Sequence, residues 1–442
     1  MKTKYADSPM PGGAMQHADT ADFESRTYAK VVQRLIPFLM LCYLGAYLDR
    51  VNVGFAKLQM LNDLQFSETI YGLGAGIFFL GYFLFEVPSN VILHKVGAKR
   101  WLARIMLTWA VISASFAFVS TPTSFYVLRF LLGVAEAGFA PGVILYMTYW
   151  FPSERRAKAL SMFFMAIPLA GIIGGPLSGY ILHAFHDVGG LSGWKWLFLL
   201  EALPSLVLGV AILVYLDNGI QGAKWLTDAE KALLARNVEA DNAHKVDHIS
   251  IGAFLADRRL WLMAAIYFCV VLGQYGLTFW LPTIIRKSGV ADPLWVGIFT
   301  ALPYLCAIVA LPLVGMSADR RRERRFHLIV PMLVAAAGFA TLPMLNGVAA
   351  SLICLCIAAA GILASSSQFW ALPTAVLGGM SAAAGIAAVN CVANLAGFFS
   401  PAIVGWLNDL TGKSTAGLIF ISMTVVVGAL LVVLVPARVV NR

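Results

Sequence analysis

The chain has 442 residues, of which 60% are hydrophobic and 12% are charged. Soluble domains carry about 25% charged residues, so this composition excludes a soluble fold. The net charge of +9 is spread over short segments and does not gather on one polar face, which excludes a nucleic-acid-binding surface. Apolar runs of about 20 residues recur, which is the length an α-helix needs to cross a bilayer. We therefore predict an all-α membrane protein and not a β-barrel.

Twelve apolar runs are long enough to span a membrane. The longest polar interruption divides them into two sets of six. We expect a tail at 1–27, an N-terminal six-helix bundle at 28–216, a linker at 217–259 and a C-terminal six-helix bundle at 260–437. The runs are residues 34–56, 70–93, 102–120, 124–150, 159–183, 196–216, 260–285, 293–316, 328–346, 350–375, 381–406 and 415–436.

The basic residues of the loops indicate the orientation. Lysine and arginine are enriched in cytoplasmic loops, so we expect both termini in the cytoplasm and the protein in a cell inner (plasma) membrane. With that orientation the cytoplasmic loops carry eleven basic residues: Lys95, Lys99, Arg100, Arg155, Arg156, Lys158, Arg320, Arg321, Arg322, Arg324 and Arg325. The opposite loops carry five: Lys57, Lys195, Arg286, Lys287 and Lys413.

The tail at 1–27 is polar and lacks the charged, apolar and small-residue order of a signal peptide. We expect it to be disordered. In the linker, Thr227 and Glu230 have the spacing of a capping box, in which each side chain satisfies a free backbone N–H group. A short amphipathic helix is therefore expected on the cytoplasmic face.

Four charged residues lie in the interior of the first and fourth apolar runs. Such residues are costly in a bilayer and by default indicate an ion or substrate path. Asp49 and Arg50 are adjacent, so they point about 100° apart on a helix and each needs another partner. Arg129 and Glu136 are two turns apart and share one face. If the two helices face each other, the four charges line one cavity wall; the alternative is a static ion-pair network that fixes helix packing.

The second half of the chain offers polar and aromatic groups within its apolar runs. These are Tyr275, Gln368, Trp370, Asn390 and Asn394. The two asparagines are four residues apart and so share a helix face. Buried amides need hydrogen-bond partners, which a polyoxygenated or aromatic acid would supply. Ordinary contacts between membrane helices are the alternative.

Two loops carry related motifs. Residues 315–325 fit the pattern G-x-x-x-D-R-x-G-x-[KR]-[KR], with Arg322 in place of the second glycine. Residues 90–100 are a degenerate copy, with Asn90 and His94 in place of the first glycine and the aspartate. We expect Asp319 and Arg320 to belong to a cytoplasmic gate loop, in which Asp319 pairs with a basic group or a helix end in one conformation.

With six-plus-six helices and these loops, residues 28–437 resemble the major facilitator superfamily. Further runs are similar to its anion:cation symporter family, most of all to the tartrate and phthalate branch. These are Tyr47, Asp49, Arg50 and Asn52, then the runs 74–90, 136–142 and 149–152.

The resemblance implies a function and roles for residues. It implies that Asp49 and Glu136 are the protonatable pair and that Arg50 and Arg129 serve anion binding and coupling. It also implies substrate contacts at Tyr47, Trp370 and Asn390, and a monomer. Some sugar-acid carriers of the family have a glutamine where this chain has Ile167 or Pro168. That departure favours a smaller diacid or an aromatic acid.

We therefore expect proton-coupled uptake of a small organic carboxylate, such as tartrate, phthalate or a related sugar or aromatic acid. The alternative is an exporter of lipophilic compounds, since Gly171, Gly175, Pro176 and Gly179 form a G-x-x-x-G-P-x-x-G run similar to one of superfamily antiporters. The same glycines also permit close helix packing. A membrane sensor would need a signalling domain, and the linker is too short for one.

The sequence gives no support to an enzyme, since it has no nucleophile–base set or phosphate loop. The six cysteines form no C-x-x-C motif and no histidine cluster accompanies them, so we expect no metal and no cofactor other than the coupling protons. The expected partners are the organic anion and the lipid bilayer.

Overall fold

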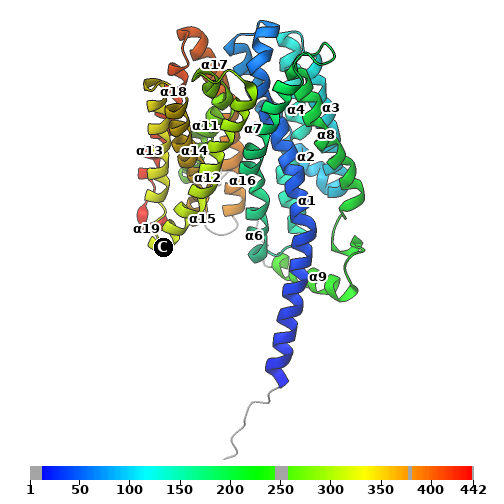
Figure 1. Cartoon of the computed structure of the whole chain (residues 1–442). Helices are drawn as coiled ribbons and strands as arrows, with labels where there is room; N and C mark the ends of the chain where they lie inside the picture. The colour runs from blue at the N-terminus through cyan, green and yellow to red at the C-terminus, as the bar shows by residue number, and fades with distance from the viewer. Residues whose placement is uncertain (1–11, 244–256, 377–380, 441–442) are drawn as a thin grey trace, which may run out of the picture.

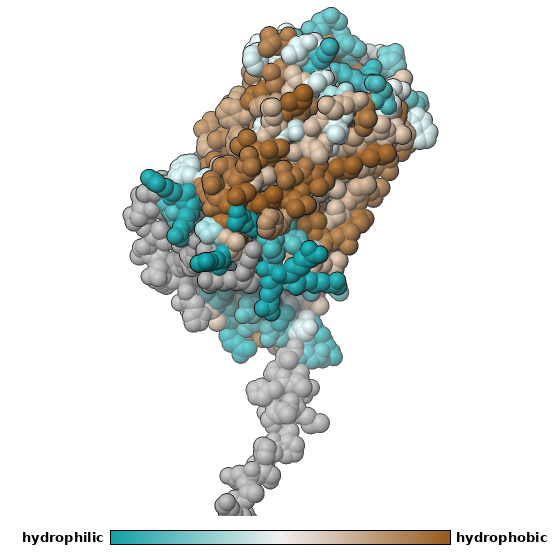
Figure 2. Space-filling view, turned by 90° about the vertical axis from the view of Figure 1, so that its left-hand side faces the viewer, coloured by the Kyte–Doolittle hydropathy of each residue, from teal (hydrophilic) through white to brown (hydrophobic). Residues whose placement is uncertain are grey.

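The computed structural model describes residues 12–243, 257–376 and 381–440. In this part of the chain, twelve helical segments are long and apolar enough to cross a membrane, and they coincide with the twelve predicted runs. The predicted fold class is therefore confirmed. On the face shown in Figure 2, a broad hydrophobic band crosses the middle of the molecule, with hydrophilic residues at both ends. Such a band matches the apolar core of a bilayer.

The helices form two bundles that stand side by side (Figure 1). The first half contains α1 (Gly12–Leu64), α2 (Glu68–Val96), α3 (Ala98–Ser115), α4 (Pro122–Glu136), α5 (Phe139–Thr148), α6 (Ser153–Phe164), α7 (Ala166–Ala184) and α8 (Gly193–Tyr215), with the short turns η1 (Phe116–Phe118) and η2 (Ile220–Gly222). Helix α9 (Asp228–Ala243) lies in the linker.

The second half contains α11 (Arg258–Lys287), α12 (Pro293–Arg321), α13 (Phe326–Thr341), α14 (Val348–Phe369), α15 (Ala371–Val376), α16 (Ser381–Asn394), α17 (Ala396–Thr411), α18 (Thr415–Val433) and α19 (Ala437–Val440), with the turn η3 (Leu342–Met344). The start of α1, the linker helix α9 and the C-terminus lie at the same end of the molecule, which we call the terminal end (Figure 1).

Four spans are interrupted within the membrane, at corresponding positions of the two halves. The fourth and fifth spans divide into α4–α5 and α6–α7, and the tenth and eleventh divide into α14–α15 and α16–α17. Paired interruptions of this kind occur where transporters bind their cargo, because broken helices leave backbone groups free inside the bundle.

The expectation of a disordered tail over 1–27 is wrong for its second part. Helix α1 begins at Gly12, well before the first apolar run, and only residues 1–11 lie outside the described chain. From Asp22 onward this extension has partners that the sequence did not reveal. Glu24 forms an ion pair of 3.0 Å with Arg155 at the start of α6, and the guanidinium of Arg155 lies over the Tyr28 ring. These contacts fix the extension of α1 against the start of α6.

The linker confirms the predicted capping box. The Thr227 N–H group donates to Glu230 over 2.8 Å, and the Glu230 N–H group donates back to Thr227 Oγ1. Burial opposes ionisation of Glu230, but these hydrogen bonds and the ammonium of Lys30, 2.9 Å away, lower the pKa of this carboxyl. Helix α9 is thereby tied to α1 at the terminal end.

The two loop motifs place corresponding residues at positive φ, although their ψ angles differ. Gly97 has φ of +95° after α2, and Arg322 has φ of +49° after α12. Arg322, with ψ of 40°, therefore lies in the left-handed helical region despite its side chain, whereas Gly97, with ψ of 144°, has a different positive-φ conformation that favours glycine. Asp319 pairs with Arg324 over 2.6 Å, while Arg320 is exposed at the helix end. The Asp319 pair is local and joins no other part of the molecule.

The two halves pack together through glycines at the end opposite the termini. Helix α2 meets α17 where Gly72 touches the Pro401 carbonyl, and α7 meets α12 where Gly175 faces Gly297. A Cβ on Gly297 would lie 2.3 Å from the Gly175 carbonyl oxygen, so no larger residue fits. The run Gly171, Gly175 and Gly179 therefore supplies the close packing that we considered beside its antiporter interpretation.

Burial along the helices shows how far this contact extends. All residues of α1 from Gly45 to Leu58 are buried, and no residue of α2 from Glu68 to Phe83 is exposed. Most residues of α2 from Leu84 to Val96 are exposed. The second half therefore covers these helices toward the end opposite the termini and not toward the terminal end. This conformation is closed at the former end.

Gly297→Ala should weaken this closure. The added methyl group would overpack the α7–α12 contact, at a cost of about 1–3 kcal/mol. Spin labels at Asp187 and Lys413, on the two halves at this end, should show a population at longer distance. The control is Gly315→Ala on the same helix, where the nearest atom is Gln368 Nε2 at 3.4 Å. An unchanged distance distribution in Gly297→Ala would contradict the closure argument.

Candidate functional site

Arg50 lies near the middle of α1, where the two halves meet. One guanidinium nitrogen donates to a carboxylate oxygen of Glu136 on α4, and the other donates to the Tyr275 hydroxyl on α11 over 3.4 Å. The guanidinium also lies over the rings of Phe78 and Tyr82, at 5.3 and 5.5 Å. Arginine favours such sites because its planar ion stacks on rings and keeps its hydrogen bonds.

Glu136 owes its position to the break in the fourth span. It is the last residue of α4, and Gly138 follows with φ of +86° before α5 begins. A Cβ on Gly138 would lie 2.4 Å from Ser89 Oγ, so the turn requires glycine both for its conformation and for its contact with α2. The sequence run from Glu136 to Gly142 therefore ends helix α4 at the Glu136 carboxylate and begins α5 after a turn at Gly138.

The Arg50–Glu136 pair is nearly shielded from solvent, with 9% and 3% of the two side chains exposed. A buried ion pair is strongly destabilised, by roughly 3–5 kcal/mol, when one partner is removed. A third charge was missed at the sequence level: Glu86 on α2 is half-buried and close enough to Arg50 to interact electrostatically. Its signal was a lone glutamate within the second apolar run.

Asp49 does not share this site. It points to the other side of α1 and accepts hydrogen bonds from Ser205 on α8, Ser113 on α3 and Trp109, at 2.6, 2.7 and 3.0 Å. The expectation that the four charges line one cavity wall is therefore wrong. Adjacent residues on a helix diverge by about 100°, and only Arg50 faces the other half.

Arg129 lies 5.0 Å from the centre of the Phe78 ring, which Arg50 also contacts, but its hydrogen bonds go to backbone groups. It is 1% exposed and donates from Nε to the Gly74 carbonyl and from a terminal nitrogen to the Ala75 carbonyl, at 3.1 and 3.0 Å. These contacts tie α4 to α2. They match the packing alternative for this residue, and they leave Arg129 without the outward-facing fork that an anion would need.

Tyr47 lies one turn before Arg50 and is buried, with the Gln274 and Thr278 side chains of α11 beside its hydroxyl. Its ring centre is 5.9 Å from the Arg50 guanidinium. Tyr47 and Tyr275 therefore flank Arg50 on the side of the second half, and their expected role as substrate contacts stays a prediction.

The remaining candidates lie on helices of the second half. Trp370, at the junction of α14 and α15, packs edge-on against Tyr267 of α11 at 4.7 Å. Gln368 is buried in α14 and lies near Gly315 of α12. Asn390 and Asn394 are half-buried on α16, which packs against α11 and α17.

A second charged cluster closes the end opposite the termini. Lys57, which we expected in a loop, lies within α1 and is only 3% exposed. Its ammonium pairs with Glu68 at 2.5 Å and lies 3.4 Å from the centre of the Trp280 ring of the second half. Glu68 also faces Lys287, at 3.7 Å. We call Lys57, Glu68, Trp280 and Lys287 the latch.

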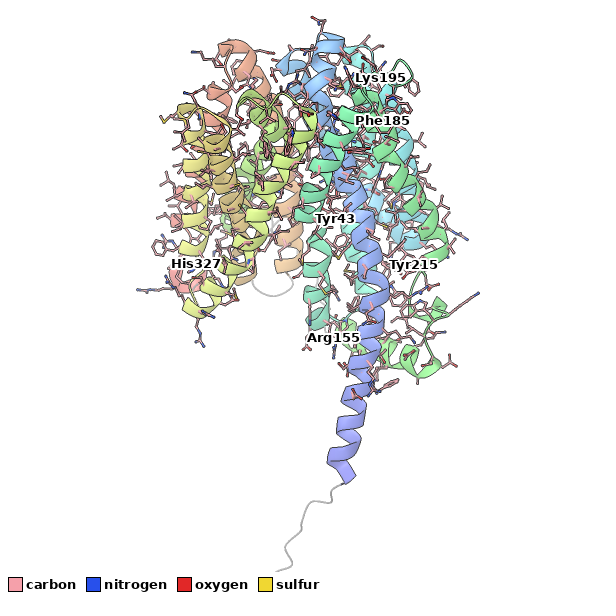
Figure 3. All side chains as sticks on the ribbon, in the orientation of Figure 1. Tyr43, Arg155, Phe185, Lys195, Tyr215 and His327 are labelled. Carbon is pink, nitrogen blue, oxygen red and sulfur yellow. The ribbon has the colours of Figure 1, made fainter. Side chains whose placement is uncertain are left out.

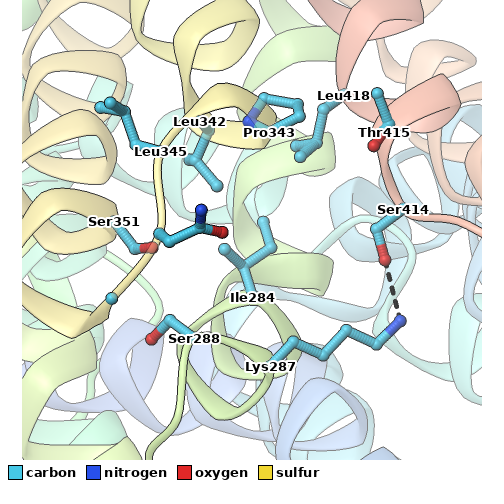
Figure 4. Close-up of a pocket in the computed structure, with 12 residues that line it drawn as sticks. Ile284, Lys287, Ser288, Leu342, Pro343, Leu345, Ser351, Ser414, Thr415 and Leu418 are labelled. Carbon is cyan, nitrogen blue, oxygen red and sulfur yellow. Dashed lines mark hydrogen bonds between the residues drawn. The ribbon is translucent and has the colours of Figure 1, made fainter.

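The sticks of Figure 3 place Lys195 and Phe185 at the latch end and Arg155 and His327 at the terminal end. A pocket of about 390 Å³ opens at the latch end between α11, α14 and α18 (Figure 4). Lys287 lies on its rim and donates to Ser414 over 2.8 Å. This pocket contains none of the predicted substrate residues, so it is separate from the Arg50 site.

Comparison with known proteins identifies the class to which this architecture belongs. The family model described as "Major Facilitator Superfamily" matches residues 39–401. The chain therefore belongs to this superfamily, whose members are transporters and not enzymes. The fold is similar to that of a solved bacterial homolog of the human lysosomal transporter Spinster, with a TM-score of 0.75 and 15% identity over 92% of this chain and 96% of that one.

Several curated relatives match over nearly their whole length. "Putative metabolite transport protein NicT" of Pseudomonas putida is 46% identical, over 98% of this chain and 100% of that protein. "Putative tartrate transporter" of Agrobacterium vitis is 47% identical, over 93% and 92% of the two chains. "Quinolone resistance transporter" of Acinetobacter baumannii is 41% identical, over 94% and 96%. The resemblance to tartrate-type carriers is thus confirmed.

The latch gives a direct prediction. Lys57→Met keeps the length of the side chain but removes its charge, so the Glu68 pair and the contact with Trp280 are both lost. Trp280→Leu removes the ring alone. Because the ammonium and the ring interact, worth about 0.5–2 kcal/mol, the double variant should lose less thermal stability in detergent than the sum of the two single variants.

The control for this cycle is Lys195→Met, which removes a lysine from the same end of the first half. Combined with Trp280→Leu it should give additive losses. Additive losses for Lys57→Met as well would show that the latch does not join the two halves.

Proposed function

We propose that this protein takes up a small organic carboxylate, such as tartrate or a related diacid, together with protons. The observation that carries the proposal is the buried Arg50–Glu136 ion pair beneath the Tyr275 hydroxyl. Arginine is the residue that best matches a carboxylate with two parallel hydrogen bonds. In this conformation Glu136 occupies the position that a substrate carboxylate would take.

Competition for Arg50 couples the two cargoes. A proton on Glu136 neutralises the carboxylate and releases the guanidinium, and an incoming organic anion then replaces Glu136 as its partner. Each event makes the other more favourable, which is a positive coupling free energy between two sites. A substrate without protons would leave two anions competing for one arginine.

The basic residues support an orientation with the terminal end in the cytoplasm of the bacterial inner membrane. The burial of Lys57 removes one of the five basic residues counted on the opposite side and so strengthens the asymmetry. With this orientation the latch closes the outer side, and the conformation is the one that releases cargo inward. Breaking the latch and closing the terminal end would expose the same arginine outward, as in rocking of two repeats around a fixed site.

The surroundings of Arg50 favour a compact, polar anion. Tyr47 and Tyr275 flank it with hydroxyl groups, and Gln274 adds an amide. Trp370, Asn390 and Asn394 supply further groups for the distal part of the substrate. The relatives named for tartrate and metabolite transport agree with this substrate class.

Export of a lipophilic drug is the second candidate, because the relative named for quinolone resistance is 41% identical. The two functions differ in what they require of Arg50. A lipophilic cargo has no use for a desolvated arginine paired with a carboxylate, whereas an organic anion requires it.

The decisive test is uptake of radiolabelled tartrate, phthalate and hydroxylated aromatic acids into proteoliposomes, with and without an inward proton gradient. We expect one class of acid to accumulate, and a protonophore should collapse its accumulation. Export or exchange of quinolones without accumulation of any acid would favour the second candidate.

Glu136→Gln should separate coupling from binding. Glutamine keeps a hydrogen-bonding group beside Arg50 but cannot carry the proton, so accumulation driven by the gradient should be lost while exchange of internal for external substrate continues. Counterflow in the same proteoliposomes measures exchange. Undiminished accumulation by this variant would remove Glu136 from the coupling mechanism.

Arg50→Lys and Arg50→Ala should weaken anion binding in that order. Lysine keeps the charge but loses the planar fork. The alanine variant should lose about 10- to 100-fold in affinity, since hydrogen bonds to charged groups contribute about 1.5–3 kcal/mol. Isothermal titration of purified protein measures the effect. Arg104→Lys, an arginine stacked on Trp101 of α3, is the control; equal affinities for wild type and Arg50→Ala would exclude Arg50 from the site.

A further inference from the structure

A second polar cluster lies inside the first bundle, on the side of α1 that faces away from Arg50. Asp49 and Asn52 are three residues apart on α1, and Glu201 and Ser205 are four apart on α8, so each pair shares a helix face. Ser205 donates to Asp49 over 2.6 Å, and the Asn52 amide lies beside the Glu201 carboxyl. The two antiparallel helices thus contact each other through two polar pairs, each with one carboxyl group. We call Asp49 with Ser205 the first rung, Asn52 with Glu201 the second rung, and the two together the ladder.

The two rungs differ in their hydrogen bonding. Asp49 accepts from three donors, Ser205, Ser113 and Trp109. Glu201 accepts from Ser178 on α7, over 2.6 Å, and among the described residues its second oxygen has no partner within hydrogen-bond distance, although the Asn52 amide lies next to this carboxyl. Asn52 is fully buried, and neither atom of its amide has a partner. Buried polar groups are almost always hydrogen-bonded, so Asn52 and the second oxygen of Glu201 lack a hydrogen-bond partner that the site must supply.

A single proton completes the second rung. Placed on the free oxygen of Glu201, it supplies a donor, and the neighbouring Asn52 amide has an unpartnered oxygen that can accept it. The charged groups around Glu201 also favour its protonated form. Asp49 is the charged group that acts on Glu201, Glu136 acts on Asp49 in turn, and no ion pair with a basic side chain involves Glu201 or Asp49 in the described chain. A buried carboxyl next to another carboxyl and without a cation takes up a proton.

We propose that Glu201 and Asn52 form a proton-binding site within the first bundle, outside the substrate cavity, and that this proton exchanges during transport. The proton bonds Glu201 to Asn52, and the site communicates with Asp49 through the ladder. That this proton exchanges during transport rests on the proposed proton-coupled uptake; that Glu201 binds it does not.

The occupied site can be observed without any substrate. Infrared difference spectra of the purified protein, taken across a pH titration, should show a protonated carboxyl band at neutral pH, where a solvent-exposed glutamate is ionised. Glu201→Gln should remove the band, because its amide replaces the acid and keeps a donor toward Asn52. Asn52→Leu should shift the band to higher frequency, because the proton loses its acceptor.

Glu239→Gln is the matched control, since Glu239 is an exposed glutamate of α9, and it should leave the band unchanged. A Glu201→Gln spectrum that retains the whole wild-type band would overturn the site. A band that disappears on adding sodium ions would identify a sodium site instead and would overturn the assignment to a proton.

Transport assays test whether this proton exchanges during the transport cycle. In proteoliposomes Glu201→Gln should keep exchange of the organic acid but lose at least half of its accumulation under a proton gradient. Unchanged accumulation, with the band lost, would show that the proton is fixed in place and would overturn its exchange. If the wild type accumulates no acid at all, the proposed uptake fails, while the infrared result on Glu201 stands by itself.

Discussion

The cost of keeping a charge inside a membrane is the constraint on which this structure depends. Arg50 cannot lose its proton, so every conformation must give it an anionic partner. In this conformation the partner is Glu136, held in place by a helix that ends at that residue. The aromatic rings around the pair exclude water and so strengthen the interaction. A site that always requires an anion, and can exchange its own carboxylate for that of a cargo once a proton neutralises it, is suited to carry one.

The remainder of the fold closes the molecule on one side of this pair. Glycines let α2 approach α17 and α7 approach α12 closely at the end opposite the termini, and the latch adds charge contacts between the halves there. Toward the terminal end α2 is largely exposed. Because the contacts between halves lie on one side of Arg50, separation of the halves at that side requires the loss of a defined set of contacts and not a rearrangement of either bundle.

Composition and periodicity predicted the twelve spans, the linker helix and its capping box, because a membrane imposes length and polarity on each segment. They also predicted Arg50 and Glu136 as intramembrane charges. They could not predict partners, which depend on the rotation of each helix. Thus Asp49, adjacent to Arg50, faces α3 and α8, Arg129 bonds to α2, and Glu201 and Glu86 passed unnoticed within apolar runs. The ordered start of α1 was missed because its partners, Arg155 and Asn237, lie far away in sequence.

The most direct test of the account is the proton balance of substrate binding. Purified protein in weakly buffered detergent solution with a pH indicator should take up protons when tartrate, or the acid identified by uptake, is added, because the anion displaces Glu136 from Arg50. Glu136→Gln should bind the acid with a smaller uptake of protons. Binding of the acid by the wild type without any uptake of protons would contradict the competition for Arg50.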